Sequence, residues 1–93
     1  MKYEVKFTGQ FKKDLKKAQK QGKDLDDLFA AVEVLAEGGK LDPSYRDHDL
    51  TGEFRGSREC HIAPDWLLIY EIRHHVLVLM LYRTGSHADL FGK

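Results

Sequence analysis

The apolar run Trp66-Leu67-Leu68-Ile69-Tyr70 constrains the fold of this chain more than any other stretch. A strand with one face in water alternates apolar and polar residues. This run does not alternate, which is typical of a central strand covered on both faces. It and the later apolar run over 76–82 are far shorter than the roughly 20 residues that a membrane helix needs. No membrane-spanning segment is therefore expected.

Two helices are predicted ahead of this strand. Residues 3–7 alternate apolar and charged side chains, so a half-buried strand comes first. Thr8 can cap a first helix that ends near Gly22. Asp24 can cap a second helix, and the short connection predicts an antiparallel helical hairpin. The second helix has an apolar stripe at helical spacing: Leu25, Leu28, Phe29, Val32, Leu35 and Ala36.

The rest of the chain predicts a sheet. A loop over 40–50 leads to strand-like stretches at 54–55, 58–63, 66–72 and 76–83. We predict an α+β fold with the order β-α-α-β-β-β-β, in which the helical hairpin packs on one face of a small antiparallel sheet. Residues 1–93 form a single domain in this prediction. Since the helices cover only one face, the 40–50 loop and the C-terminal tail must partly cover the other and line a cleft there.

Lysine is concentrated in the first quarter of the chain, although the 15 basic and 15 acidic residues balance to zero net charge. A lysine-rich helix face can bind phosphate groups at low salt. It can also be an ordinary solvated helix surface, and the charge pattern alone favours that interpretation.

Cys60 is the only cysteine, so no intramolecular disulfide can form. The N-terminus lacks the apolar stretch of a secretory signal, and both observations favour a reducing cytoplasm. A thiol next to His61 could act as a nucleophile. Neighbouring residues of a strand point to opposite faces, which instead favours Cys60 in the core and His61 directed away from it.

Histidines are the main candidates for chemistry, because imidazole titrates near neutral pH and is the most common general acid or base. Of the five, His74 and His75 lie in a predicted turn and are expected to be structural. Zinc could be held by His48, His61, His87 and Asp65. Their spacing gives no local metal motif, so we predict no metal and no cofactor.

Residues 45–52 (YRDHDLTG), 58–70 (RECHIAPDWLLIY) and 83–92 (RTGSHADLFG) resemble the YafQ branch of the RelE superfamily of bacterial toxins. The resemblance implies a ribosome-dependent mRNA endoribonuclease that inhibits translation and is neutralised by a cognate antitoxin. It also implies metal-free cleavage, in which the RNA 2′-hydroxyl attacks the adjacent phosphate. The catalytic positions of the family fall on His48, His61, Asp65 and His87, and a substrate-holding position falls on Phe91.

The residue types suit this chemistry, which needs a base, an acid and a group that stabilises the phosphate. We assign His87 as the general acid. The Pro64-Asp65 turn is predicted to place Asp65 beside His61 as a base and orienting pair, while His48 donates to the phosphate or shares the role of base.

Four further residues are predicted to contact the substrate: Arg83, Phe91, Glu59 and Trp66. Arg83 can bind phosphate oxygens or be structural. Trp66 and Phe91 can stack on a base, although an indole that opens an apolar strand can also be core. Glu59 occupies a position where the family pattern has aspartate. Lys13, Lys16 and Lys17 of the first helix are expected to contact ribosomal RNA.

Two alternatives remain. A ParE-like toxin would bind gyrase and cut no RNA, and an inactive homologue would bind only its antitoxin. A binding module has no need for three histidines that converge with Asp65, which favours the enzyme.

Overall fold

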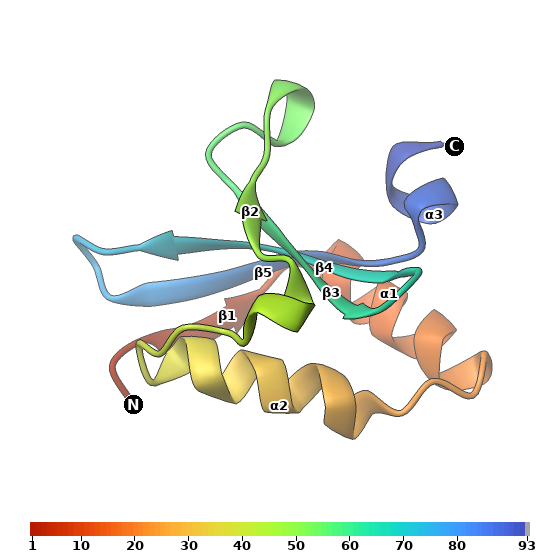
Figure 1. Cartoon of the computed structure of the whole chain (residues 1–93), viewed down its shortest axis with the longest axis horizontal. Coiled ribbons are helices and arrows are strands. Elements are labelled where there is room, and N and C mark those ends of the chain that lie inside the picture. The colour runs from red at the N-terminus through yellow and green to blue at the C-terminus, as the bar shows by residue number, and fades with distance from the viewer. Residues whose placement is uncertain (93) are drawn as a thin grey trace.

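The computed structural model describes residues 1–92 and has an α+β architecture in which five strands form one sheet with the order β1-β5-β4-β3-β2 (Figure 1). The elements in chain order are β1 (Glu4–Phe7), α1 (Gly9–Lys20), α2 (Leu25–Ala36), η1 (Pro43–Tyr45), β2 (His48–Asp49), η2 (Gly52–Phe54), β3 (Arg58–Ala63), β4 (Trp66–Arg73), β5 (Val78–Gly85) and α3 (His87–Phe91). The predicted fold class is confirmed.

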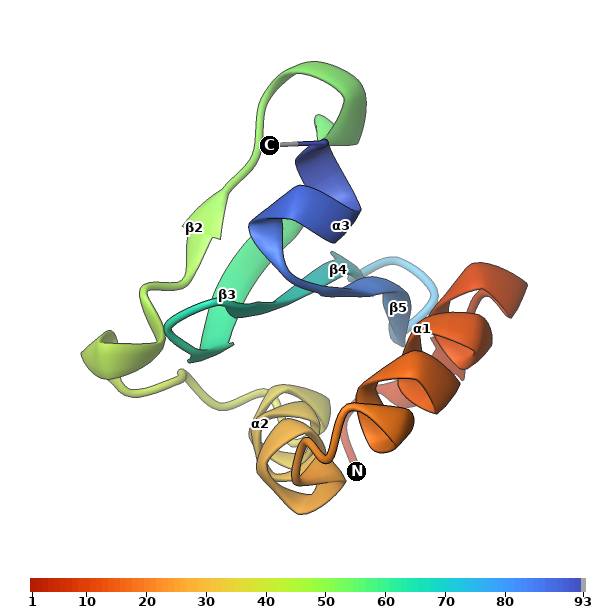
Figure 2. The same cartoon turned by 90° about the vertical axis from the view of Figure 1, so that its right-hand side faces the viewer.

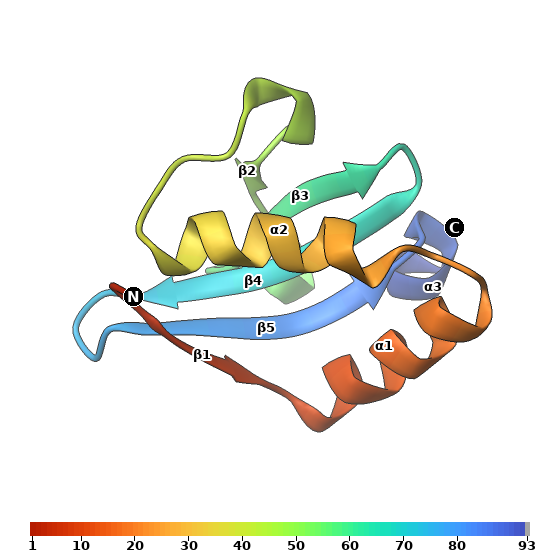
Figure 3. The ribbon, with the colours of Figure 1, turned by 90° about the horizontal axis from the view of Figure 1, so that it is seen from below.

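Helices α1 and α2 both lie on one face of the sheet (Figures 1 and 3). As predicted, the Thr8 hydroxyl accepts a hydrogen bond from the Phe11 amide at 3.0 Å, and the Asp24 carboxylate accepts one from the Asp26 amide at 2.9 Å. The two helices bury a core against the sheet that includes Phe11, Leu28, Cys60, Leu68, Tyr70, Leu79 and Leu81. Among residues 1–92, no helix is long and apolar enough to cross a membrane.

The opposite face of β4 is also covered, which explains the unbroken apolar run. Leu67 and Ile69 are fully buried there beneath Leu90 of α3, with Leu50 and Phe54 packed against them. Figure 2 shows α3 and the 52–54 turn on the side of the sheet away from α1 and α2. The C-terminal tail covers this face as predicted, and the η2 turn contributes Phe54. The prediction for the 40–50 loop is confirmed only at its end, Leu50, because Leu41 and Tyr45 pack against the core on the helix side.

Two details of the predicted sheet are wrong. Strand β1 pairs with β5 in parallel, so the sheet is mixed. Short turns force the β3–β4 and β4–β5 pairs to be antiparallel, whereas most of the chain separates β1 from β5 and no turn fixes its direction. The second strand is His48–Asp49, because residues 52–54 form a 3₁₀ turn.

Cys60 lies in the core beneath the helices and is fully buried, as the strand alternation predicts. Burial raises the pKa of its thiol to about 12, with nearby Asp47 and Glu59 adding to the effect. A thiol with this pKa stays protonated near neutral pH, so the nucleophile interpretation is wrong.

Candidate active site

Three separate elements bring their histidines into one row on the face of the sheet opposite α1 and α2. The ring centroids of His48 in β2 and His61 in β3 are 6.3 Å apart, and those of His61 and His87 in α3 are 5.8 Å apart. Phe91 continues the row 6.4 Å beyond His87. The structure therefore brings together four of the predicted site residues, and their catalytic roles stay predictions.

His48 is oriented by its own chain. Its Nδ1 lies 2.7 Å from the carbonyl oxygen of Arg46. A carbonyl only accepts, so Nδ1 carries the proton and donates, which leaves Nε2 for other chemistry. That Nε2 lies 3.7 Å from the Glu59 carboxylate. Arg46 adopts a left-handed backbone conformation with φ of 51°, and this turn aims its carbonyl at the imidazole.

The short β2 strand is held by a charged network that we call the Arg58 clamp, made of Arg58, Asp47, Asp49 and Tyr70. Arg58 donates to Asp47 at 3.0 Å and to Asp49 at 2.6 Å, the two acids that flank His48. The Tyr70 hydroxyl donates to the other Asp47 oxygen at 2.6 Å. Burial raises the pKa of Tyr70, and its hydrogen bond to Asp47 raises it further. The clamp therefore fixes the backbone on both sides of His48.

Glu59 and His61 form the centre of the site. Glu59 is buried, and its carboxylate lies 3.9 Å from His61 Nε2 as well as near His48. The Nδ1 atom of His61 is enclosed, with no hydrogen-bond partner among residues 1–92. Proton transfer at His61 is thus confined to the Nε2 side. Glu59 sits between two imidazoles, where it can orient both or hold a proton.

Asp65 pairs with His87, so the predicted pairing with His61 is wrong. One Asp65 oxygen accepts from the His87 backbone amide at 3.1 Å and lies 2.9 Å from His87 Nδ1. The backbone hydrogen bond and the imidazole hydrogen bond hold the pKa of Asp65 below its usual value. The cause of the pairing is the register of the sheet: Leu67 pairs with Gly85, which places the Pro64-Asp65 turn beside the start of α3.

Helix α3 is short, and local contacts hold it in place. The Ser86 side chain and Asp89 form a reciprocal capping box at its start. Lys17 of α1 binds Asp89 at 2.7 Å. Phe54 of the η2 turn packs edge-on against Phe91, with ring centroids 5.7 Å apart. Phe91 remains 37% exposed, so part of its side chain is accessible to a ligand.

Two predicted substrate contacts have structural roles instead. Trp66 is only 4% exposed, and its indole donates to the Thr84 hydroxyl at 2.9 Å. Base stacking on Trp66 is therefore excluded in this structure, because the ring is part of the core. Arg83 donates to both oxygens of buried Asp14, at 2.7 and 3.2 Å, and so joins β5 to α1. The structural alternative stated for Arg83 is the one that the geometry favours.

A metal ion would fit a different set of residues from the one considered above. Glu59, His61 and His87 each offer one ligand atom, and these atoms lie within 4.8 Å of one another. Imidazole nitrogens and a carboxylate suit first-row divalent ions such as zinc or copper. Asp65 and His48 do not belong to this set.

Sequence reasoning missed the Arg58 clamp and Asp14. The sequence does contain an indication of the clamp, because Asp47 and Asp49 flank a histidine. A cation opposite them would be bound by both carboxylates. Only the strand register, which pairs Asp49 of β2 with Arg58 of β3, shows that this cation is Arg58.

His74 was predicted to be a structural turn residue. Its Nδ1 lies 3.1 Å from the Tyr3 hydroxyl, which agrees with that prediction.

Comparison with known proteins identifies close relatives of this chain. Residues 3–92 match the family described as the bacterial toxin of type II toxin-antitoxin system, YafQ. The mRNA interferase toxin YafQ of Escherichia coli K12 is 40% identical over 90 residues, which is 96% of each protein.

Solved structures of bacterial toxins have the same fold as this chain. The chain resembles that in the crystal structure of the E. coli DinJ–YafQ complex with a TM-score of 0.88 and 40% identity, over 97% of this chain and 99% of that one. A metal-bound toxin from Helicobacter pylori gives a TM-score of 0.90 at 43% identity, over 98% and 100%.

Proposed function

Because this chain belongs to the YafQ family of toxins from bacterial type II toxin–antitoxin systems, we propose that it is an mRNA interferase that cuts translated mRNA on the ribosome. The observation that carries the proposal is the histidine row. In it, His48 and His87 each have Nδ1 held by an oxygen and Nε2 left for a substrate. The oriented imidazoles of His48 and His87, on either side of His61, can supply a base and an acid without further groups.

The reaction is a transfer within the RNA. The 2′-hydroxyl attacks the adjacent phosphorus, and its proton passes to Nε2 of His48. The bond from phosphorus to the 5′-oxygen breaks, and that oxygen takes a proton from Nε2 of His87. The products are a cyclic phosphate and a free 5′-hydroxyl. His61 lies between the two imidazoles, where it contacts the phosphate, and Glu59 lies beside the proton taken up by His48.

Asp65 acts through His87. A carboxylate on Nδ1 fixes the ring orientation and stabilises the imidazolium from which the 5′-oxygen takes its proton. The low pKa of Asp65, caused by the hydrogen bonds from the His87 amide and imidazole, keeps it ionised throughout the neutral range. Asp65 is therefore a positioning residue, and His87 is the general acid.

We propose that the reaction needs no metal. A divalent ion would be held by Glu59, His61 and His87, and when bound it would act as a Lewis acid toward a phosphate oxygen. The histidines themselves supply proton transfer and phosphate contact. To test this, the toxin is stripped with phenanthroline, dialysed and then added to ribosomes in magnesium buffer. An unchanged cleavage rate supports the proposal, and a rate restored only by added zinc or copper contradicts it.

The proposed partners are a cognate antitoxin and the ribosome. On α1, Lys13 and Lys16 are available for ribosomal RNA, whereas Lys17 already binds Asp89. We expect Lys13→Glu with Lys16→Glu to weaken co-sedimentation with ribosomes most at low salt, because surface charge contacts are screened. Unchanged sedimentation would contradict this contact.

The experiment that tests the function is induction of the wild type and of His87→Ala in cells, with mapping of the 5′ ends of transcripts. Cuts in phase with codons that disappear in the variant support the mRNA interferase. Growth arrest without new 5′ ends contradicts it and favours a toxin that binds gyrase.

A further inference from the structure

Strand β5 extends beyond the strand that covers its outer edge. Strand β1 pairs with β5 only as far as Leu81, whereas β5 continues to Gly85. The backbone amide of Thr84 lies on the uncovered part of this edge and is buried, so it needs an acceptor from another element. Helix α1 runs beside this end of β5 (Figure 3). Its Asp14 carboxylate accepts from the Thr84 amide at 3.1 Å.

Asp14 is buried and accepts hydrogen bonds on both carboxylate oxygens. Besides the Thr84 amide, Arg83 donates to it twice, at 2.7 and 3.2 Å, and Gln10 donates from one turn earlier in α1 at 3.2 Å. A buried carboxylate is costly unless it is paired and hydrogen-bonded, so these contacts fix the position of Asp14. The end of β5 is therefore held against α1 by its backbone as well as by a side chain.

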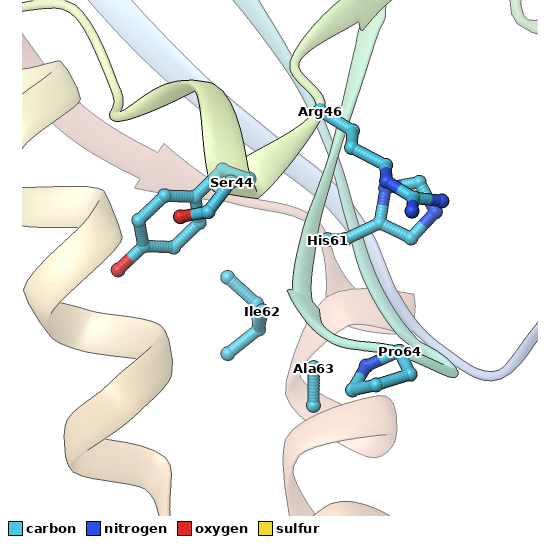
Figure 4. A pocket seen from close by; sticks show the side chains of 7 residues that line it. Ser44, Arg46, His61, Ile62, Ala63 and Pro64 are labelled. Carbon is cyan, nitrogen blue, oxygen red and sulfur yellow. The ribbon is translucent and has the colours of Figure 1, made fainter.

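Thr84 extends this network to the start of β4. Its buried hydroxyl accepts from the Trp66 indole at 2.9 Å and donates to the carbonyl oxygen of the next residue at 2.7 Å. Trp66 directly follows Asp65, in the turn where Figure 4 shows Pro64 at the end of β3. Thr84 itself lies three residues before His87. Both members of the pair formed by Asp65 and His87 are thus anchored close to Thr84.

A second contact of α1 reaches α3 itself. Lys17 lies one turn beyond Asp14 on the same face of α1 and binds Asp89 at 2.7 Å. The two contacts hold the chain before His87, at Thr84, and after it, at Asp89. The Lys17 side chain is 57% exposed, so water screens its ion pair, and buried Asp14 supplies more of the restraint.

We propose that Asp14 is a positioning residue for the general acid. This inference rests on the proposed function, in which His87 protonates the departing 5′-oxygen. Through Thr84, Asp14 holds the end of β5 and the β3–β4 turn in one arrangement. That arrangement maintains the 2.9 Å contact between Asp65 and His87. The base, His48, lies on β2 outside this network, so loss of Asp14 weakens the acid and leaves the base in place.

Three variants test the network, and one controls for stability. Asp14→Asn keeps the shape of the side chain and removes its charge. Thr84→Val removes the hydroxyl that joins Trp66 to β5, and Thr84→Ser keeps that hydroxyl. The control is Val32→Ala, because Val32 is a buried residue of α2 whose apolar side chain contributes to stability without a hydrogen bond. Circular dichroism identifies a temperature at which every variant is folded.

Single-turnover cleavage is measured on ribosomes with natural RNA and with an RNA whose 5′-oxygen at the cut is replaced by sulfur, a leaving group that needs no proton. Asp14→Asn and Thr84→Val are expected to cut natural RNA about ten-fold more slowly, because a catalytic group misplaced by about 1 Å can lose about 10²-fold in rate. Both should cut the sulfur-containing RNA at the wild-type rate. Thr84→Ser and Val32→Ala are expected to cut both RNAs at the wild-type rate.

Two results of this experiment would overturn the inference. One is an equal loss on both RNAs, since it would assign Asp14 to substrate binding or to the overall fold. The other is wild-type cleavage of natural RNA by Asp14→Asn or, if that variant does not fold, by Thr84→Val.

Hydrogen exchange supplies a readout that does not depend on cleavage. The His87 backbone amide donates to Asp65 at 3.1 Å, so its exchange rate reports local opening of this pair. The rate should rise in Asp14→Asn and Thr84→Val and stay at the wild-type value in Val32→Ala. Unchanged exchange in the first two variants would contradict the positioning role. If the wild type makes no cuts while exchange responds as expected, the proposed function fails and the role of Asp14 in holding His87 stands.

Discussion

The β2 and α3 flanks of the site present the same side chain in two different electrostatic settings. On the β2 flank, His48 has Nδ1 against a neutral carbonyl, that of Arg46. On the α3 flank, His87 has Nδ1 against the ionised carboxylate of Asp65. A carbonyl selects a tautomer without favouring charge, whereas a carboxylate favours the imidazolium. In the proposed reaction, this contrast lets one residue type supply both the base and the acid.

The two flanks also differ in how they are held. The β2 flank is only two residues long and depends on the Arg58 clamp, which reaches the buried hydroxyl of Tyr70. The α3 flank depends on its capping box, on the ion pair of Lys17 with Asp89 and on Leu90 in the core. Damage to one flank should therefore leave the other in place.

The strongest test of the contrast replaces each histidine with glutamine. Both His87→Gln and His48→Gln are expected to slow single-turnover cleavage by about 10²–10⁴-fold, the usual contribution of a general acid or base. The two losses become distinguishable with an RNA whose 5′-oxygen at the cut is replaced by sulfur. Thiolate leaves without a proton, so this substrate should restore cleavage by His87→Gln and not by His48→Gln. Rescue of the His48 variant instead would reverse the assigned roles.

The Asp65→Asn variant removes the difference between the flanks, because an amide oxygen can accept the same hydrogen bonds without a charge. We expect cleavage to fall by about 10–10²-fold, less than on loss of the imidazole itself. The RNA with sulfur at the leaving position should restore cleavage by this variant as well, since Asp65 acts through the acid. The control is Asp26→Asn at the exposed start of α2. A loss that the sulfur substrate does not restore would reduce Asp65 to a structural turn residue.

The same carboxylate predicts how α3 responds to acid. The folded-state pKa of Asp65 lies below its unfolded value near 3.8, so its contribution to stability is complete above that value and is lost as the pH falls through the folded pKa. The side-chain carboxyl carbon of Asp65 should therefore keep the chemical shift of the ionised form from neutral pH to about pH 5. Protonation of that carboxyl within this interval would show that Asp65 titrates higher than the hydrogen bonds imply.

The sequence identified the helices and central strands because periodicity and capping are local. The stripe of α2 and the alternation that buries Cys60 were read from adjacent residues. The direction of β1 and the partner of Asp65 depend on which ends of distant strands meet, and no local pattern encodes that. Burial of Trp66 against Thr84 likewise depends on a contact between separate strands. The convergence of the histidines was expected from the family resemblance, but their individual hydrogen-bond partners were not.

The Tyr70→Phe variant tests the β2 flank alone. It removes the hydroxyl that donates to Asp47 and is expected to lower the free energy of unfolding by about 1.5–3 kcal/mol, as for a hydrogen bond to a charged group. Cleavage by the folded protein should fall by about ten-fold, because a loosened β2 misplaces His48. The control is Tyr82→Phe, whose hydroxyl bonds to Glu71 and Arg73 away from the site. Equal cleavage by the two variants would show that Arg58 holds β2 without the tyrosine.

The smallest expected effect belongs to the α3 flank and uses the capping box. Ser86→Ala removes the hydroxyl that accepts from the Asp89 amide, and Thr8→Ala removes the matching cap of α1. Each should cost about 1 kcal/mol of unfolding free energy. Only the first should slow cleavage, by about two- to three-fold, because Asp65, Lys17 and Leu90 still hold α3 while its first turn frays. If Thr8→Ala slows cleavage as much, helix stability alone explains the loss, and His87 does not depend on a local cap in the way that His48 depends on its clamp.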